Sequence, residues 1–330
     1  MIVETHTLAG MFRAIAGRLR SSGHEVVYFT DPARAAESRE MPAADILIAA
    51  SNLKCDRALM MASPKLRAVL YGAIGTDGID LAAASELGIV VGHGPTAQNY
   101  RSMAEATVLL MLALLYDLRG SEEILRRNQP RPLELRGRML AGRTIGLIGF
   151  GRIARTVAEN LSSWGAKLQT YTRSPERAAI PREVRSVGLD ELLATSDIVS
   201  IHATRNPQSE KLIGERELAL MKPTALLVNT ARGGIVDERA LVQALQERRI
   251  AGAALDTFEA EPLSPHSALR RLDNVILTPH LLGHTRDLME SLEATLLESV
   301  GNVLAGAPPR YVRNPEVLAR WGARWGKAAA

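Results

Sequence analysis

The sequence predicts an α/β protein made of two doubly wound, parallel-sheet lobes. Its 330 residues correspond to about two domains at roughly 100 to 200 residues each. Short apolar and β-branched runs alternate with helical stretches in both halves, which is the rhythm of a parallel sheet. A second set of alternating elements starts at residue 144, and a glycine-rich turn joins its first strand to a helix. We therefore expect each lobe to have its own sheet.

In the first half, strands and helices are predicted from apolar runs and from the turn residues that bound them. The strand-like runs are residues 25–29, 45–49, 66–71 and 88–91. Helical patterns cover Gly10–Leu19, before a Ser-Ser-Gly turn, and Leu81–Leu87, closed by Gly88. These segments alternate as the strands and helices of a βαβ chain do.

The middle of the chain predicts a long apolar helix and then a linker. Ser102–Glu105 has the pattern of a capping box, so a helix is expected over Ala106–Leu118. Its all-round apolar character predicts a buried scaffold element. The polar, proline-containing segment Arg126–Pro132 is typical of a linker.

Composition excludes several classes of protein. With 46% hydrophobic and 23% charged residues and a net charge of +4, the chain is globular and not disordered. Basic residues are scattered and aromatics make up only 4%, so we expect no nucleic-acid partner. Only the tail is locally basic, and we interpret it as a solvated face: Arg310, Arg313, Arg320 and Arg324.

Cellular location is expected to be cytoplasmic, without a membrane partner. The opening residues Met1–Glu4 lack the pattern of a secretory signal, and the longest apolar run, Ala106–Tyr116, is far below the roughly 20 residues that span a bilayer. The single cysteine, Cys55, cannot form an internal disulfide and is expected to be an inert thiol.

A dinucleotide site is predicted at residues 149–154. The strand Thr144–Ile148 leads into a G-x-G-x-x-A turn, and a helix is expected over Arg155–Trp164. Gly149 permits the tight turn, Gly151 allows the backbone to approach a pyrophosphate, and a small Ala154 allows close helix–strand packing. The amides of the helix start favour a phosphate. The expected cofactor-binding residues of this turn are Gly149, Gly151, Arg152 and Ile153.

The choice between NADP and NAD depends on the end of the next strand, residues 168–171. An NAD site usually places an acidic residue there for the ribose 2′-hydroxyl, whereas this chain has Thr172, Arg173 and Ser174. A guanidinium and a hydroxyl favour a 2′-phosphate, so NADP is the preferred cofactor and NAD remains possible. The alternative is that Arg173 is an ordinary surface residue beside a Ser-Pro turn.

Three segments of the second half each combine a strand with a turn, and each contains a polar residue that suits catalysis. They are Val228–Asp237 with Arg232, Ala254–Pro262 with Glu261, and Asn274–His280 with His280. Ligands of a doubly wound sheet collect beyond the carboxyl ends of its strands, so these side chains are expected to converge. Each residue taken singly is more typical of a surface position or a turn.

Together and in this order, the motifs resemble the D-isomer-specific 2-hydroxyacid dehydrogenase family, near its glyoxylate and hydroxypyruvate reductases. The resemblance covers nearly the whole chain. It includes the segments Tyr71–Asp80, Ser102–Glu105, Leu140–Gly146, Leu220–Pro223 and the three strand–turn units.

The resemblance implies a role for each of these residues in hydride transfer between NADP(H) and a small 2-oxo acid. His280 is the acid that protonates the carbonyl oxygen, Glu261 holds its imidazole, and Arg232 binds the substrate. Backbone amides at Ala73, Ile74 and Gly75 resemble the family's carboxylate cradle. Positions that match those around the nicotinamide are Thr230, Asp256 and Gly283.

The resemblance also implies the domain organisation. A Rossmann cofactor domain is expected over residues 102–284. A discontinuous, flavodoxin-like substrate domain is expected over 1–101 and 285–330, with a helix at about 285–304 returning to the first lobe. Relatives are commonly dimers, so a homodimer is expected.

One departure from the family pattern bears on the substrate, and a pair of histidines raises the question of a metal. Gly92-His93-Gly94-Pro95 lacks the asparagine common before that proline, in a loop that faces the substrate in relatives. His280 and His284 are four residues apart, but Pro279 and Gly283 disfavour a helix that would present both to a metal, so no metal is expected.

A second class of function remains an alternative. Dinucleotide-sensing corepressors share this fold, so the chain could bind a regulatory partner, although no extension for one is evident. Other enzymes are disfavoured: a formate-oxidising relative would have glutamine at position 261, and no tyrosine has the lysine of a short-chain dehydrogenase four residues later.

Overall fold

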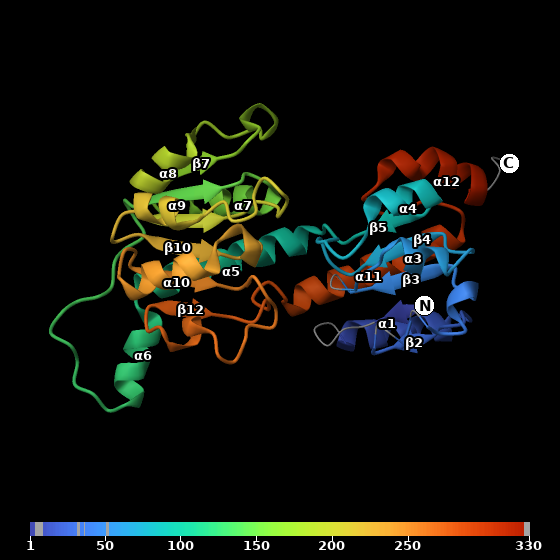
Figure 1. The fold of residues 1–330 in the computed structure, drawn as a ribbon, viewed down its shortest axis with the longest axis horizontal. Coiled ribbons are helices and arrows are strands. Elements are labelled where there is room, and N and C mark those ends of the chain that lie inside the picture. The colour runs from blue at the N-terminus through green and yellow to red at the C-terminus, as the bar shows by residue number, and fades with distance from the viewer. Residues whose placement is uncertain (4–8, 32–33, 36, 51–52, 327–330) are drawn as a thin grey trace. The chain divides into compact units, whose positions relative to one another are not determined.

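The chain folds into two compact α/β units, each with its own parallel sheet. The computed structural model describes residues 1–3, 9–31, 34–35, 37–50 and 53–326. One unit consists of Met1–Asn99 and Thr285–Ala330, and the other is Tyr100–His284 (Figure 1). The predicted fold class, two lobes with doubly wound parallel sheets, is confirmed.

The first unit contains a five-stranded parallel sheet in the order β2-β1-β3-β4-β5, which is the flavodoxin order. Its strands are β1 (Ile2–Val3), β2 (Tyr28–Phe29), β3 (Ile46–Ala49), β4 (Ala68–Tyr71) and β5 (Val90–Gly92). Its helices are α1 (Ala9–Ser21), α3 (Arg57–Met61), α4 (Leu81–Leu87), α11 (Arg286–Leu304) and α12 (Leu318–Trp325), with 3-10 turns at Met41–Ala43 and Pro315–Val317.

Burial of both faces explains why these strands are continuous apolar runs. One core packs α1, α11 and α12 on the sheet around Phe12, Leu296 and Trp321. The other core packs α3 and α4 on the opposite face around Met60 and Ala84. The predicted C-terminal helix is α11, and Thr285 caps it by accepting a hydrogen bond from the Leu288 amide (3.2 Å).

Two elements of the first unit differ from the sequence prediction. Only Tyr28–Phe29 of the expected strand at 25–29 pairs in the sheet, and β1 was not predicted at all. β1 has two residues, too few to show a periodic pattern, yet Ile2 lies in the middle of the sheet between Tyr28 and Ile48. Long-range pairing, and not local pattern, forms this strand.

The second unit contains a seven-stranded parallel sheet in the order β12-β11-β10-β9-β6-β7-β8. The order reverses beside β6, which is the topological switch point of a Rossmann fold. Its strands are β6 (Thr144–Ile148), β7 (Lys167–Tyr171), β8 (Val184–Ser186), β9 (Ile198–Ile201), β10 (Leu226–Asn229), β11 (Gly252–Leu255) and β12 (Val275–Leu277). Its helices are α5 (Ala97–Leu115, whose first turn belongs to the first unit), α6 (Leu118–Arg126), α7 (Arg152–Leu161), α8 (Leu189–Thr195), α9 (Glu215–Leu220) and α10 (Glu238–Gln246). Its 3-10 turns are Pro175–Arg177, Gly233–Ile235 and Ala268–Arg271.

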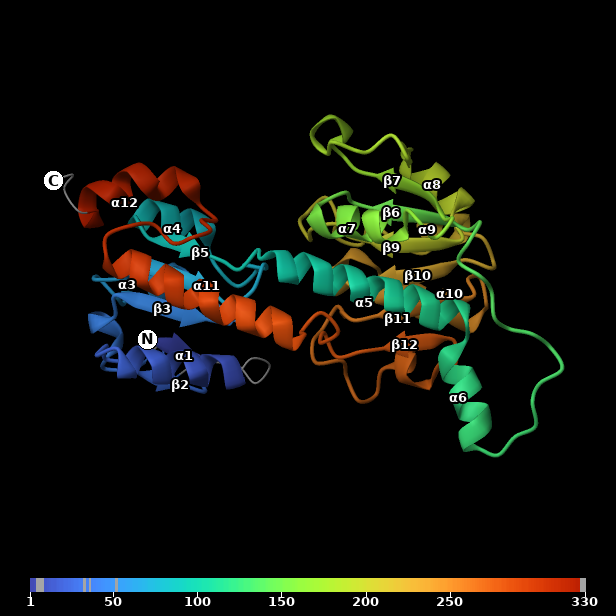
Figure 2. The ribbon, with the colours of Figure 1, turned by 180° about the vertical axis from the view of Figure 1, so that it is seen from behind.

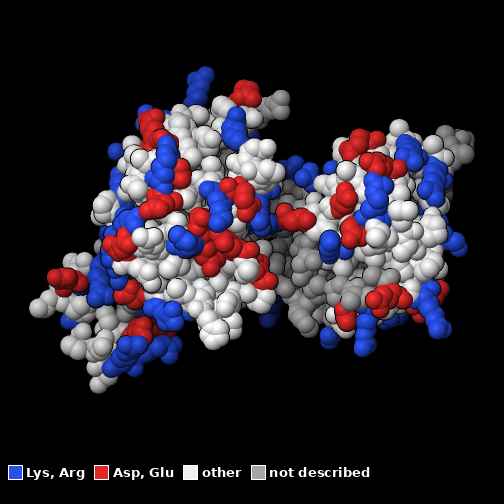
Figure 3. Space-filling model, in the orientation of Figure 1, with Lys and Arg blue, Asp and Glu red and all other residues white. Residues whose placement is uncertain are grey.

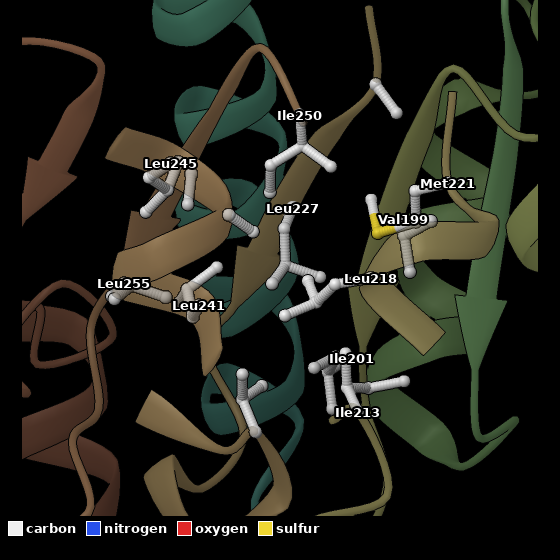
Figure 4. Packing of buried hydrophobic residues seen from close by; sticks show 14 of the residues in the cluster. Val199, Ile201, Ile213, Leu218, Met221, Leu227, Leu241, Leu245, Ile250 and Leu255 are labelled. Atoms are coloured by element: carbon white, nitrogen blue, oxygen red, sulfur yellow. The ribbon is translucent and has the colours of Figure 1, made fainter. Parts of the chain in front are cut away.

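Successive strand residues point to opposite faces of this sheet. Both faces carry apolar side chains, so helices cover both of them. Leu227 of β10 packs with α8, α9 and α10, as Figure 4 shows for the core around Leu218, Leu241 and Leu245. Its neighbours on the strand, Leu226 and Val228, pack with α5 and α7 on the other face, the one turned toward the viewer in Figure 2.

The long helix α5 begins earlier than predicted. Thr96 accepts a hydrogen bond from the Asn99 amide at its start (3.3 Å), so residues 97–101 are helical and Ser102 is not a cap. The Ser102 hydroxyl instead donates to the Gly283 carbonyl (2.6 Å). The capping-box prediction is therefore wrong, because a threonine six residues upstream supplies the cap. The helix also ends at Leu115, three residues before the predicted end.

The predicted linker at Arg126–Pro132 lies within the second unit and not between the two units. It belongs to a stretch, residues 127–143, that has neither helix nor strand and follows α6. Figure 2 shows this segment as a long loop that leaves the body of the second unit.

Charged residues of both signs are interspersed on the face that Figure 3 shows. The four arginines of the basic tail are exposed, as predicted, and two of them also make surface contacts within the first unit: Arg310 pairs with Glu298 (2.8 Å) and Arg324 donates to the Pro64 carbonyl (3.2 Å). Burial, with a smaller effect from Asp56, raises the pKa of the Cys55 thiol to about 12, which suits an inert group. Among the described residues, no helix has the length and apolar character needed to cross a membrane.

Candidate active site

The turn after β6 requires glycine at its first position. Gly149 has a φ of +90°, and its amide donates to the Tyr171 carbonyl (2.7 Å). A Cβ at this position would lie 2.9 Å from the backbone of His202 and Ala203 at the end of β9. Because any side chain would be strained and would collide with backbone, the turn can be this tight only with glycine.

The next glycine leaves the start of α7 open for an anion. Gly151 is the N-cap of this ten-residue helix, no side chain caps it, and a Cβ there would meet open space. The unpaired amides of a helix start and the helix dipole favour a phosphate. Ala154 is fully buried, so the helix packs closely on the sheet. These residues fit the pyrophosphate of a dinucleotide.

Two further residues of the predicted cofactor turn lie in the first turn of α7. Arg152 turns back to Tyr100, to whose hydroxyl it donates, and its guanidinium lies 5.1 Å from the centre of that ring. Ile153 is partly buried and packs against the core formed by α5 and α7. The Arg152 side chain is thus held beside the glycine turn.

The segment after β7 contains no acidic residue at the positions that would face a ribose 2′-hydroxyl. Thr172 and Ser174 are partly buried, and Arg173 is exposed. The Arg173 guanidinium donates to the Gln208 side chain at 3.4 Å, a long hydrogen bond on the surface. The Arg173 guanidinium would therefore lose little free energy if it left Gln208 to bind a phosphate.

An imidazole and a carboxylate are paired beyond the ends of β11 and β12. Nδ1 of His280 lies 2.7 Å from Oε2 of Glu261, and the other carboxylate oxygen accepts a hydrogen bond from the Phe258 amide (3.0 Å). Partial burial raises the pKa of Glu261, but these two hydrogen bonds, the charge of His280 and that of Arg232 outweigh it, so the net shift is downward. Glu261 therefore stays ionised and orients the ring.

The backbone that presents His280 is held in an unusual conformation. His280 has a φ of +54°, and its amide donates to the Thr278 carbonyl (3.0 Å). Asp256, almost fully buried, holds this segment through one oxygen, Oδ1, which accepts from the Thr278 hydroxyl (2.6 Å) and from the Leu281 amide (3.0 Å). Left-handed backbone at a non-glycine residue costs about 1 kcal/mol or more and persists only where neighbours enforce it.

Arg232 is presented by a tight turn after β10. The Asn229 side chain bridges this turn, since it accepts from the Ala231 amide (3.0 Å) and donates to the Arg232 carbonyl (3.0 Å). At Gly233 a Cβ would lie 1.9 Å from the backbone carbonyl carbon of Phe258. This turn therefore packs directly on the segment that also carries Glu261, which places Arg232 at the same edge of the sheet as the His280–Glu261 pair.

The helix α5 contacts two more of the predicted residues, Thr230 and Gly283. Thr230 is buried, and its hydroxyl lies 3.0 Å from that of Thr107. Gly283 accepts from Ser102, and a Cβ there would collide with the Met103 sulfur at 1.8 Å. One helix thus braces both the end of β10 and the segment that follows His280.

A second histidine stacks on the first. The rings of His280 and His284 are parallel within 3°, with centroids 6.4 Å apart. Burial and the charge of His280 lower the pKa of His284, although Asp256 opposes the shift. Within the described ranges, no group of three or more His, Cys, Asp or Glu residues is arranged to hold a metal ion.

Sequence reasoning missed three residues of this site. Asn229 and Gly233 lie within a segment already singled out, but only the structure shows that one bridges the Arg232 turn and the other allows it to pack. His202 directly follows β9, where its backbone contacts Gly149, and burial lowers the pKa of its imidazole to about 4. Its Nε2 lies 2.9 Å from the Ser200 hydroxyl. A histidine directly after a buried strand was the available signal.

The proposed cradle residues belong to the first unit. Ala73, Ile74 and Gly75 follow β4 at the carboxyl edge of the five-stranded sheet, and all three are partly buried. The structure thus assigns them to a different unit from Arg232, Glu261 and His280.

A Rossmann sheet with a glycine turn at its switch point, and an imidazole–carboxylate pair with an arginine at the same edge, define a dinucleotide-dependent oxidoreductase. The model of the family "D-isomer specific 2-hydroxyacid dehydrogenase, NAD binding domain" matches residues 108–281. The chain belongs to the D-isomer specific 2-hydroxyacid dehydrogenase family, whose members are NAD(P)-dependent oxidoreductases.

Several curated and solved proteins are similar to the chain. A glyoxylate reductase of Thermofilum pendens is 40% identical over 294 residues, which cover 87% of this chain and 86% of that protein. A D-3-phosphoglycerate dehydrogenase of Archaeoglobus fulgidus is 35% identical over 90% of this chain, but the match spans only 56% of that longer protein.

Among solved structures, the NADPH-dependent glyoxylate/hydroxypyruvate reductase of Sinorhizobium meliloti, in complex with NADP and malonate, superposes with a TM-score of 0.85 at 26% identity. The superposition covers 100% of this chain and 98% of that one. The predicted family is thus confirmed, and a nicotinamide dinucleotide is its cofactor.

Proposed function

We propose that the protein reduces a small 2-oxo acid of the glyoxylate or hydroxypyruvate class to the D-2-hydroxy acid, with NADPH as the preferred hydride donor. The observation that carries the proposal is the 2.7 Å contact between His280 and Glu261 at the same sheet edge as Arg232. The similarity to glyoxylate reductases supports the substrate class.

Each residue of this set has a distinct role in the proposed reaction. The nicotinamide, when bound, supplies the hydride to the carbonyl carbon. His280, protonated, donates its proton to the carbonyl oxygen and accepts it back in the reverse direction. Glu261 favours the protonated imidazole and fixes its orientation. Arg232 binds the 2-oxo acid through charge-assisted hydrogen bonds and stabilises the negative charge that develops on oxygen.

We assign the cofactor to residues 102–284 and the substrate carboxylate to residues 1–101 and 285–330. Gly149, Gly151, Arg152 and Ile153 would hold the pyrophosphate. The nicotinamide would be bound by Thr230, Asp256 and Gly283. The amides of Ala73, Ile74 and Gly75 would receive the carboxylate. Oδ1 of Asp256 already accepts three hydrogen bonds from its own chain, so Oδ2 is the atom left to accept from the carboxamide.

The decisive experiment is a substrate panel. Purified protein mixed with NADPH or NADH and a series of 2-oxo acids should oxidise the cofactor, with the highest kcat/KM for glyoxylate or hydroxypyruvate. A folded protein that binds NADPH but reduces no member of the panel would contradict the proposal. Capture of a protein partner that depends on NADPH would then favour the regulatory alternative.

Replacement of Arg173 by aspartate should reverse the cofactor preference. Loss of the charge-assisted hydrogen bond to the 2′-phosphate, together with repulsion by the new carboxylate, should reduce kcat/KM for NADPH by about 10- to 100-fold. The value for NADH should stay the same or rise. Initial rates with each cofactor measure this.

A matched control for this experiment is Arg182→Asp, since Arg182 is also exposed and lies outside the turn after β7. It makes the same change of charge and should leave the ratio of the two cofactors unaltered. Equal effects of the two substitutions would show that Arg173 acts only through net charge, and would contradict its assignment.

We propose that the chain forms a homodimer through α5, α6 and the loop that follows. Large apolar side chains on these segments are exposed, with Leu125 at 83%, Leu135 at 86% and Leu133 fully exposed. Several large apolar side chains exposed on consecutive segments are typical of a surface that a partner covers. Leu109, on the helix predicted to be well buried, is also exposed at 52%.

Light scattering should therefore give twice the 35.7 kDa mass of one chain. The double variant Leu133→Glu, Leu135→Glu should give one chain mass, because two carboxylates would have to be buried in the contact. Met61→Glu, at an exposed methionine of the first unit, is the control. A monomeric unmodified protein would contradict the proposal.

A further inference from the structure

Two successive carbonyl groups after β4 are held by the loop after β5. The Gly94 amide donates to the Ala73 carbonyl (2.8 Å), and Nδ1 of His93 lies 3.1 Å from the Ile74 carbonyl oxygen. A carbonyl oxygen can only accept, so the proton of this second hydrogen bond must be on Nδ1. A side chain and a backbone amide from one loop thus bind two neighbouring peptide groups of another.

Because the peptide group is planar, these two contacts also fix the direction in which the N–H groups of Ile74 and Gly75 point. In a planar trans peptide the C=O and the following N–H point in opposite directions. Fixing the carbonyls of Ala73 and Ile74 toward the loop at 92–95 therefore turns the amides of Ile74 and Gly75 away from it. In the described part of the chain neither amide has a hydrogen-bond partner. Adjacent, unpaired N–H groups of this kind make an anion-binding concavity.

The loop that carries His93 is itself fixed. The His93 amide donates to the Tyr311 carbonyl (3.2 Å), and Thr96 contacts Ser291 through hydroxyl groups 3.0 Å apart. At Gly94 a Cβ would lie 2.3 Å from a methyl group of Leu292 on α11, so the loop packs closely on that helix and a larger residue would have to displace the leucine side chain. The backbone that carries His93 is therefore held in place by its neighbours.

We propose that His93 is a positioning residue for substrate binding. Its imidazole fixes the peptide group between Ile74 and Gly75, so that the Gly75 amide is aimed at the substrate carboxylate. The Gly94 amide does the same for Ile74 and is independent of any side chain. The inference rests on the proposed function, since it concerns how the 2-oxo acid is held, and it gives a role to the departure from the family pattern at Gly92–Pro95.

The test compares variants that keep or remove the hydrogen-bond donor. His93→Ala and His93→Leu lack it, and the leucine fills the space that alanine leaves empty. His93→Asn restores an N–H donor of similar reach. Removal of the donor should raise KM for glyoxylate about tenfold, the effect of one lost hydrogen bond, while kcat changes by less than about threefold. His93→Asn should recover most of the loss.

Two further measurements separate positioning from general damage. Reduction of a 2-oxo aldehyde, which has a similar carbonyl but no carboxylate, should keep its kcat/KM in every variant. Thermal unfolding midpoints should show that the variants are folded. His24→Ala, an exposed histidine of the same unit, is the matched control and should behave as the unmodified protein.

Affinity for oxalate, measured by calorimetry on protein saturated with NADPH, gives a readout that needs no turnover. Weaker binding in His93→Leu that is restored in His93→Asn supports the inference even if the unmodified protein reduces no 2-oxo acid, in which case only the proposed function fails. An unchanged KM and an unchanged oxalate affinity in His93→Leu, or equal losses in the leucine and asparagine variants, would overturn it.

Discussion

His280→Asn should lower kcat for 2-oxo acid reduction by about 10²- to 10⁴-fold, the contribution typical of a positioned general acid. Asparagine keeps a polar side chain of similar size but has no proton to give at neutral pH. The affinity for NADPH should change by less than about twofold, because the hydrogen bond of this side chain is to Glu261 and the residues assigned to the pyrophosphate lie in the separate turn after β6. Steady-state rates and a fluorescence titration of NADPH measure the two quantities.

The matched control for this substitution is His266→Asn, since His266 is an exposed histidine of the same unit. It should leave both quantities unchanged. If His280→Asn retained the full rate, His280 could not be the acid, whatever the glycine turn binds. If it lost NADPH affinity by as much as it lost rate, its role would lie in cofactor binding and not in proton transfer.

The pH dependence of the rate gives an independent check through Glu261. Burial opposes ionisation of this carboxyl group, but hydrogen bonds from His280 and Phe258 lower its pKa overall, so the carboxylate is charged throughout the neutral range. Glu261 holds the imidazole best as a carboxylate, so the rate should persist into mildly acidic solution and be lost only as pH falls through the lowered pKa of Glu261. Glu261→Gln has no group to titrate in that range, so this loss of rate on the acid side should disappear.

The parts of the site that sequence could predict are those fixed by local constraints. A strand that runs into Gly149 and Gly151 has few other conformations, since the first has positive φ and the second leaves the helix start open. Glu261 and His280 could be expected to meet because parallel strands end at one edge, and they do meet at 2.7 Å.

Two kinds of feature could not be predicted from the sequence. In one, two local signals compete for the same role; in the other, residues far apart in the sequence come into contact. The pattern at Ser102–Glu105 is a valid cap signal, but Thr96 caps the helix first. Asp256 was expected to face the nicotinamide, and only the structure shows that one of its oxygens also holds the segment around His280. The contact between His93 and Ile74 joins two loops, which no local pattern reveals.

Arg232→Met should lower kcat/KM for the 2-oxo acid by about 10²- to 10³-fold, as expected for loss of a preorganised donor to a developing oxyanion. Methionine retains much of the length and the apolar stem, so the turn held by Asn229 and Gly233 should be preserved. Affinity for NADPH should be unaffected. Arg248→Met, at an exposed arginine that pairs with Asp273, is the control and should have no effect.

The comparison with Arg232→Lys identifies what the guanidinium contributes. Lysine keeps the charge but cannot make the planar, two-pronged contact, so it should recover only part of the lost kcat/KM. Full recovery would mean that Arg232 acts as a point charge and does not align the carbonyl. A loss in kcat/KM that came entirely from KM, with kcat intact, would show that Arg232 binds substrate and transition state equally. A fall in kcat is therefore the result that ties Arg232 to the chemical step.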